Sequence, residues 1–121
     1  VLRVEGAHGT ALLTGDIEAI SEATLLDDAR GRLQADLLIA PHHGSRTSST
    51  PAFVAAVAAR HVVFTVGYRN RFGHPRADIV ARYGDTPSWR TDRDGAVSVI
   101  LGDQAVVSGY RSERRRYWYG R

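Results

Sequence analysis

Short apolar runs alternate with stretches of helical periodicity along most of the chain. The runs that predict strands are Val1–Val4, Thr10–Leu13, Leu37–Ala40 and His61–Val66. The stretches that predict helices are Glu18–Ala29, Pro51–Ala59 and Arg76–Tyr83. Because strands and helices alternate in this order, the pattern predicts an α/β fold with parallel strands.

The rest of the pattern predicts three further strands at Ser88–Thr91, Ala96–Leu101 and Gln104–Val107. Turns at Asp94-Gly95 and Gly102-Asp103 separate these strands, and His8-Gly9 joins the first two strands of the chain as a hairpin. The first predicted strand begins at the first residue, Val1, so we expect the chain to start inside a larger domain.

Polar side chains follow two of the predicted strands. Thr14-Gly15-Asp16 follows the second strand, and Pro41-His42-His43-Gly44-Ser45 follows the third. Strand ends that bring His and Asp to one edge of a sheet are a common way to build a metal site. Two alternatives stay open: Asp16 as the cap of the next helix, and the histidine pair as a surface or capping feature. The hydroxyl-rich stretch Ser45–Thr50 is suited to capping the helix that follows it.

A third polar loop, Tyr68–Pro75, follows the next strand along the chain. Because parallel strands place their carboxyl ends at one edge of a sheet, we expect this loop beside the other two. Arg69 and Arg71 are suited to pairing with phosphate oxygens, and His74 precedes a proline that favours an extended backbone.

The composition is that of a small folded domain. The chain has 121 residues, of which 43% are hydrophobic and 24% charged, and it has no cysteine. Disulfides and thiolate metal sites are therefore excluded. The sequence contains no apolar run of about 18 residues and no signal-peptide pattern.

Basic charge is concentrated at the carboxyl end of the chain. Residues 111–121 contain five arginines and one glutamate, and the arginines are interspersed with Tyr117, Trp118 and Tyr119. Such a segment is suited to binding phosphates and stacking on bases, and the alternative is a solvated terminus. We therefore divide the chain into a domain at residues 1–110 and a basic aromatic tail at residues 111–121.

Four stretches in order carry a family resemblance: Leu12-Leu-Thr-Gly-Asp16, Pro41-His-His-Gly-Ser-Arg-Thr-Ser-Ser49, Asn70-Arg-Phe-Gly-His-Pro75 and Asp94-Gly-Ala96. Together they resemble the metallo-β-lactamase-like domain of the ComEC family of DNA-internalisation competence proteins. The resemblance implies the C-terminal half of an αββα sandwich. It also implies a soluble region of a bacterial inner-membrane channel protein that carries single-stranded DNA, with the periplasmic face favoured.

The resemblance also implies roles for individual residues. Asp16 matches an aspartate that bridges two metal ions, and His42, favoured over His43, matches a histidine ligand. His43 and His74 are then expected near the reaction, His74 as a phosphate or proton-transfer group. Substrate contacts are expected from Ser45, Arg46, Arg69, Asn70 and Arg71.

The early histidine-rich motif of that family has no counterpart here, since His8 falls in a hairpin turn and His61 opens an apolar strand. We therefore expect this chain to be part of a longer protein whose complete domain binds Zn²⁺ or Mn²⁺ and hydrolyses phosphodiesters, while this part binds little or no metal. The arginines favour a phosphodiester over an acyl substrate. The alternative function is a non-catalytic domain that binds DNA or associates with the channel.

Overall fold

The structure, a computed structural model, describes residues 1–103 and 105–114. Its strands are β1 Leu2–Glu5, β2 Thr10–Leu13, β3 Leu37–Ile39, β4 His61–Phe64, β5 Ser88–Arg90, β6 Val97–Leu101 and β7 Ala105–Gly109. Its α-helices are α1 Ala19–Ala29, α2 Pro51–Val57, α3 Ala77–Ala81, α4 Thr91–Asp94 and α5 Tyr110–Glu113. Short 3₁₀ segments cover Arg30–Arg32 and Pro41–Gly44. No helix in the described part of the chain has the length and apolar character needed to cross a bilayer.

The main sheet has five strands in the order β1-β2-β3-β4-β5. Strand β1 is antiparallel to β2, and every other neighbouring pair is parallel. The structure confirms a mixed α/β fold with a mostly parallel sheet. Because β2, β3 and β4 are parallel, the loops that follow them leave the same edge of the sheet.

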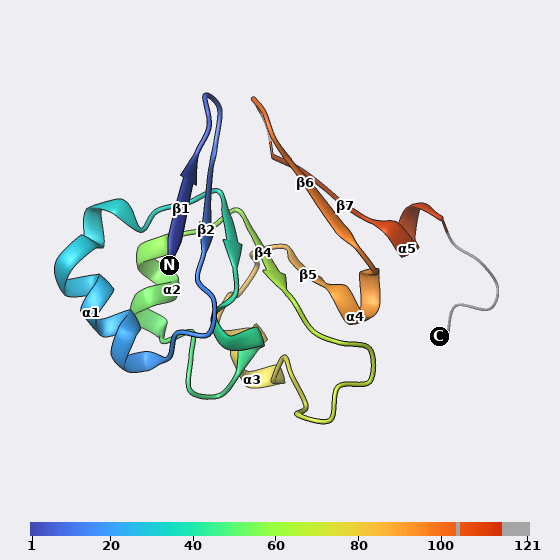
Figure 1. The fold of residues 1–121 in the computed structure, drawn as a ribbon, viewed down its shortest axis with the longest axis horizontal. Coiled ribbons are helices and arrows are strands. Elements are labelled where there is room, and N and C mark those ends of the chain that lie inside the picture. The colour runs from blue at the N-terminus through green and yellow to red at the C-terminus, as the bar shows by residue number, and fades with distance from the viewer. Residues whose placement is uncertain (104, 115–121) are drawn as a thin grey trace.

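The central strands are buried on both faces, as parallel strands usually are. On one face, Leu12, Leu38 and Val62 pack with residues of α1, α2 and α3. On the other face, Leu37 and Val63 pack with alternate residues of β6. Figure 1 shows this layering, with α1 and α2 on one side of the main sheet and the β6–β7 hairpin on the other.

The carboxyl-terminal third departs most from the pattern-based prediction. Strand β5 joins the main sheet beside β4, whereas β6 and β7 form a separate antiparallel pair. Helices α4 and α5 were not predicted, and α5 includes Arg111, Ser112 and Glu113 from the start of the predicted tail. The aromatic part of that tail, Tyr117–Tyr119, lies outside the described residues.

The turn between β3 and the hydroxyl-rich stretch depends on a glycine. Gly44 has a φ of +78°, and a Cβ added there would lie 2.6 Å from Cβ of Pro75 and 2.9 Å from Cδ1 of Phe64. Both distances are shorter than van der Waals contact. The close approach of the loops after β3 and β4 therefore requires a residue without a side chain.

We predict that Gly44→Ala lowers the free energy of unfolding by at least about 2 kcal/mol, because it adds both overpacking and left-handed strain. Gly84→Ala is the matched control, since Gly84 has a φ of +56° but a Cβ added there would meet nothing within 4 Å. The control should lose only about 1–2 kcal/mol from strain. Urea denaturation followed by tryptophan fluorescence measures both, and equal losses would contradict the packing argument.

Candidate functional site

Three loops meet at the carboxyl edge of the main sheet. The hydroxyl of Thr14, just after β2, donates to the carbonyl of Ile39 at the end of β3 (2.7 Å). The backbone N–H of His42 donates to the carbonyl of Gly15 (2.9 Å). The carbonyl of Gly44 accepts from the N–H of Arg76, which follows the third loop (3.1 Å). These three hydrogen bonds thus hold the loops in one place.

The two adjacent histidines have an unusual backbone. His42 and His43 have φ values of 48° and 57°, both in the left-handed region that non-glycine residues rarely adopt. Strain of this kind costs on the order of 1–3 kcal/mol per residue and persists only where the surroundings impose it. The strained turn directs both imidazoles toward the loops that follow β2 and β4.

His43 is held at both ring nitrogens. Its Nδ1 lies 2.7 Å from the carbonyl oxygen of Thr65, so Nδ1 carries a proton and donates it. Its Nε2 lies 3.2 Å from Oδ1 of Asp16. In neutral His43, Nε2 therefore presents a lone pair toward a carboxylate, which is favourable only if a proton or another cation lies between them. A histidine with one nitrogen donating to a carbonyl is the usual arrangement of a metal ligand.

His42 brings a second imidazole to the same place. Its Nδ1 is buried and lacks a hydrogen-bond partner, although Oε1 of Glu18 lies 3.2 Å away. The centre of the His42 ring is 6.3 Å from that of His43 and 6.3 Å from that of His74. We call Asp16, Glu18, His42, His43 and His74 the histidine cluster.

His74 comes from the third loop, residues 67–75, which we call the aromatic loop. Asn70 bonds to the backbone of His74 twice: its Nδ2 donates to the carbonyl (2.7 Å), and its Oδ1 accepts from the N–H (2.9 Å). Burial lowers the pKa of His74 below 6.5, and repulsion from His42 and His43 lowers it further. His74 is therefore neutral at pH 7 and able to accept a proton.

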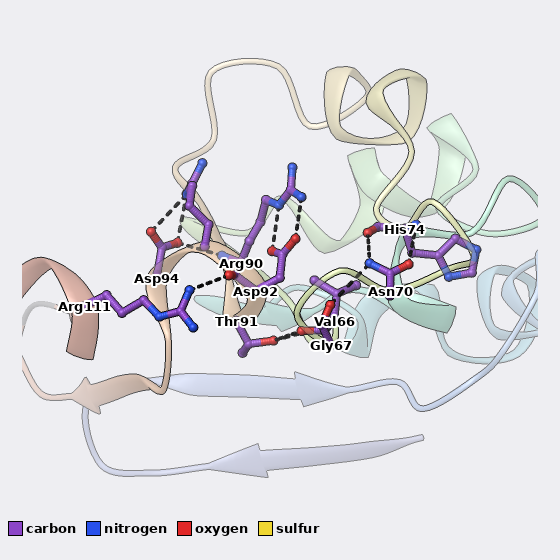
Figure 2. A network of polar contacts seen from close by, with 10 residues as sticks. Val66, Gly67, Asn70, His74, Arg90, Thr91, Asp92, Asp94 and Arg111 are labelled. Atoms are coloured by element: carbon purple, nitrogen blue, oxygen red, sulfur yellow. Dashed lines mark hydrogen bonds and ion pairs between the residues drawn. The ribbon is translucent and has the colours of Figure 1, made fainter. Parts of the chain in front are cut away.

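Figure 2 shows how the base of the aromatic loop is fastened. The Thr91 hydroxyl donates to the carbonyl of Val66 (2.7 Å) and accepts from its N–H (2.8 Å). Arg111 of α5 donates to the carbonyl of Asp92 (2.8 Å), and Asp92 forms a two-bond ion pair with Arg90. The loop therefore starts from a rigid junction of β4, β5 and α4.

The predicted substrate contacts come from the stretch after the histidine turn and from the aromatic loop. Arg46, Arg69 and Arg71 are exposed, and none of them pairs with a carboxylate in the described part of the chain. The Ser45 hydroxyl lies 3.3 Å from that of Thr47. The Asn70 side chain is engaged with His74, so the structure gives it a bracing role within the loop. Its assignment as a substrate contact stays a prediction.

The alternative role of Asp16 as a helix cap is not what the structure shows. Helix α1 has Glu18 at its N-cap position, without a side-chain capping bond, and Asp16 instead contacts His43. The predicted cap of the next helix is confirmed, because the Thr50 hydroxyl accepts from the N–H of Phe53 (3.4 Å).

Sequence reasoning missed Glu22, which is fully buried in α1. Its carboxylate accepts from the N–H of Ser49 (2.6 Å), and from the N–H (2.7 Å) and hydroxyl (2.9 Å) of Thr50. Ser49 also bonds to the hydroxyl of Tyr83 (2.7 Å), whose pKa burial raises to about 12. The burial of Glu22 could have been inferred from its position, because it is four residues before buried Leu26 on the same helix face.

The fit of the site to a metal ion can be judged from these contacts. The described residues contain no group of three or more His, Cys, Asp or Glu side chains already arranged to hold an ion. Asp16 with Nε2 of His43, and Glu18 with the buried Nδ1 of His42, nevertheless are ligand atoms of the kinds that bind Zn²⁺ and Mn²⁺. The residues present therefore fit part of a metal site.

Similarity to known proteins extends over nearly the whole chain. It is 33% identical over 98% of its length to competence protein ComA of Neisseria gonorrhoeae, and 27% identical over 80% to ComE operon protein 3 of Bacillus subtilis. The chain is similar to segments of competence proteins. It is also 35% identical over 98% of its length to the uncharacterized protein YcaI of Escherichia coli.

The chain spans only 13–17% of the length of these relatives. No protein-family model matches the chain, and no solved structure matches it at a significant level. The similarity to competence proteins therefore concerns one segment of them, and the match to ComA covers nearly the whole chain.

We predict that the NMR titration midpoint of His74 lies below 6.5 and moves toward 6.5 in His42→Ala, which removes one repelling ring. The unfolded chain protonates His74 at higher pH than the folded chain. The contribution of His74 to stability is therefore intact above about pH 6.5 and decreases as pH falls toward the lowered pKa. Ile100→Ala on the β6–β7 hairpin is the control and should leave the midpoint unchanged. A midpoint at or above 6.5 in the unsubstituted chain would contradict the burial argument.

Proposed function

We propose that this chain is the C-terminal half of a metallo-β-lactamase-like domain in a competence protein, and that the complete domain hydrolyses phosphodiesters in incoming DNA. The observation that carries the proposal is the contact between Asp16 and Nε2 of His43 at the meeting point of three loops. The similarity to two proteins named for competence supports the biological setting.

Asp16 and the histidine pair are the residues of this chain that would hold Zn²⁺ or Mn²⁺. The sequence favoured His42 as the ligand, and its buried Nδ1, which makes no hydrogen bond and lies 3.2 Å from Oε1 of Glu18, is consistent with that role. The Thr65 contact additionally prepares Nε2 of His43 to bind a cation, so we propose that both rings take part. The remaining ligands come from outside this chain. When bound, such ions lower the pKa of a bound water to about 7 and supply hydroxide.

The other loops fit a phosphodiester substrate. Arg46 follows the histidine turn, and Arg69 and Arg71 belong to the aromatic loop. None has a carboxylate partner among the described residues, so their charge is available for phosphate oxygens. Neutral His74 is suited to taking or giving a proton at the reacting phosphate. These features favour a phosphodiester over the acyl substrates of lactamases.

A second function is worth testing because the same surface needs no metal to bind DNA. Exposed arginines next to exposed rings are suited to a non-catalytic domain that binds single-stranded DNA or associates with the channel. In either case, we propose that the partners are single-stranded DNA, the preceding half of the domain and a membrane channel in the same protein. The location proposed is the periplasmic face of the bacterial inner membrane.

We predict that the 121-residue chain alone binds Zn²⁺ with a Kd no better than tens of micromolar, because it supplies too few ligands for a two-metal site. Isothermal titration calorimetry measures this. Submicromolar binding that is lost in Asp16→Ala would show that the chain holds a complete site.

The same chain should not cleave single-stranded DNA, since it has no metal pair to generate hydroxide.

In the complete protein, we predict metal-dependent cleavage of single-stranded DNA that falls at least about a hundredfold in Asp16→Asn and in His43→Ala, because each removes a ligand. His8→Ala, in the exposed β1–β2 hairpin, is the matched histidine control and should keep full activity. DNA binding without cleavage in the complete protein, unaffected by Asp16→Asn, would favour the non-catalytic function.

A further inference from the structure

The aromatic loop exposes two rings beside the histidine cluster. Phe72 is 70% exposed and Tyr68 is 58% exposed. Exposing whole aromatic rings is unfavourable in water, so a pair of them on one short loop indicates a binding surface. The question is which partner fits them.

Phe72 extends the histidine cluster outward by stacking. Its ring centre lies 6.0 Å from that of His74, with the two planes only 29° apart. His74 in turn lies edge-on to His42 at 6.3 Å. A flat group placed on the exposed part of Phe72 would therefore continue a stack that leads directly to the proposed reaction centre.

Each exposed ring is accompanied by arginine. The guanidinium of Arg71 lies 5.6 Å from the centre of Phe72, and those of Arg69 and Arg111 lie 5.2 Å and 5.5 Å from the centre of Tyr68. Arg69 and Arg71 have no carboxylate partner among the described residues. Positive charge beside an exposed aromatic ring matches a phosphate beside a nucleobase.

The loop is also fixed before any ligand binds. The paired bonds of Asn70 to His74, and of Thr91 to Val66, hold both its ends (Figure 2). A rigid platform loses little conformational entropy on binding, whereas a mobile loop would lose much more.

We propose that Phe72, with Tyr68 beside it, is a platform on which an unpaired nucleobase stacks, so that the adjoining phosphate lies at the histidine cluster. Bases of a duplex are stacked on one another and are not free to cover a protruding ring. The platform therefore selects single strands through this loop. This inference rests on the proposed function, because it takes nucleic acid as the ligand.

The test is fluorescence anisotropy of the intact chain at low salt with three labelled ligands: an oligo(dT) strand, an abasic strand of equal length, and a duplex. Phe72→Ala should weaken oligo(dT) binding about tenfold, corresponding to about 1.4 kcal/mol of stacking, and change abasic binding less than about twofold. Phe72→Trp should restore oligo(dT) binding. Arg71→Gln should weaken both single strands, since both carry phosphates. Ile100→Ala, another exposed apolar residue, should change nothing.

The results separate the platform from the proposed function. If the unsubstituted chain binds oligo(dT) and abasic strands equally well, and Phe72→Ala does so too, the platform is overturned while phosphate recognition stays in place. Absence of binding to all three ligands would overturn the proposed function together with the platform. Size-exclusion chromatography tests a protein interface instead. If the chain self-associates, and Phe72→Ala abolishes this without changing oligo(dT) binding, the ring belongs to a protein interface and the platform is overturned.

Discussion

The arrangement of the site depends on one buried carboxylate. Glu22 is inaccessible to solvent, and its burial would be costly without compensation. Three hydrogen bonds from Ser49 and Thr50 provide that compensation. They join α1 to the start of α2 and fix the hydroxyl-rich stretch that leaves the histidine turn. Arg82 also donates to the carbonyls of Ser48 and Ser49, so a second side chain holds the stretch.

This anchoring explains how a strained turn persists. His42 and His43 occupy left-handed backbone conformations that an unconstrained loop would leave. Behind them Gly44 packs against Phe64 and Pro75 with no room for a side chain. The turn therefore cannot relax without breaking either the Glu22 bonds or the contact with β4. Strain held this way keeps both imidazoles pointing at neighbouring loops before a ligand arrives, which reduces the reorganisation needed on binding.

Local patterns predicted the parts of the fold that are buried on both sides. Strands β2, β3 and β4 are short apolar runs, and the carboxyl ends of parallel strands lie at one edge, so the meeting of Asp16 with His43 was accessible from sequence. The separation of β6 and β7 from the main sheet could not be predicted from the sequence, because tertiary contacts decide which strands pair. Glu22 resembles any surface glutamate until the loop that satisfies it is placed. Nothing in the sequence indicated that Asn70 would be used within its own loop.

If the proposed function is right, protons and metal cations compete for the ring nitrogens of the histidine cluster. Three imidazoles lie in a chain of 6.3 Å steps. Burial is the largest cause of the lowered pKa of His74, and repulsion from positive charge on His42 and His43 lowers it further. Asp16 and Glu18 each lie 3.2 Å from one ring and partly offset that charge. A divalent cation needs neutral imidazole and therefore gains as pH rises. Burial and repulsion from the neighbouring rings keep protons off His74 near neutral pH, so His74 adds no positive charge beside the two rings that we propose as cation ligands.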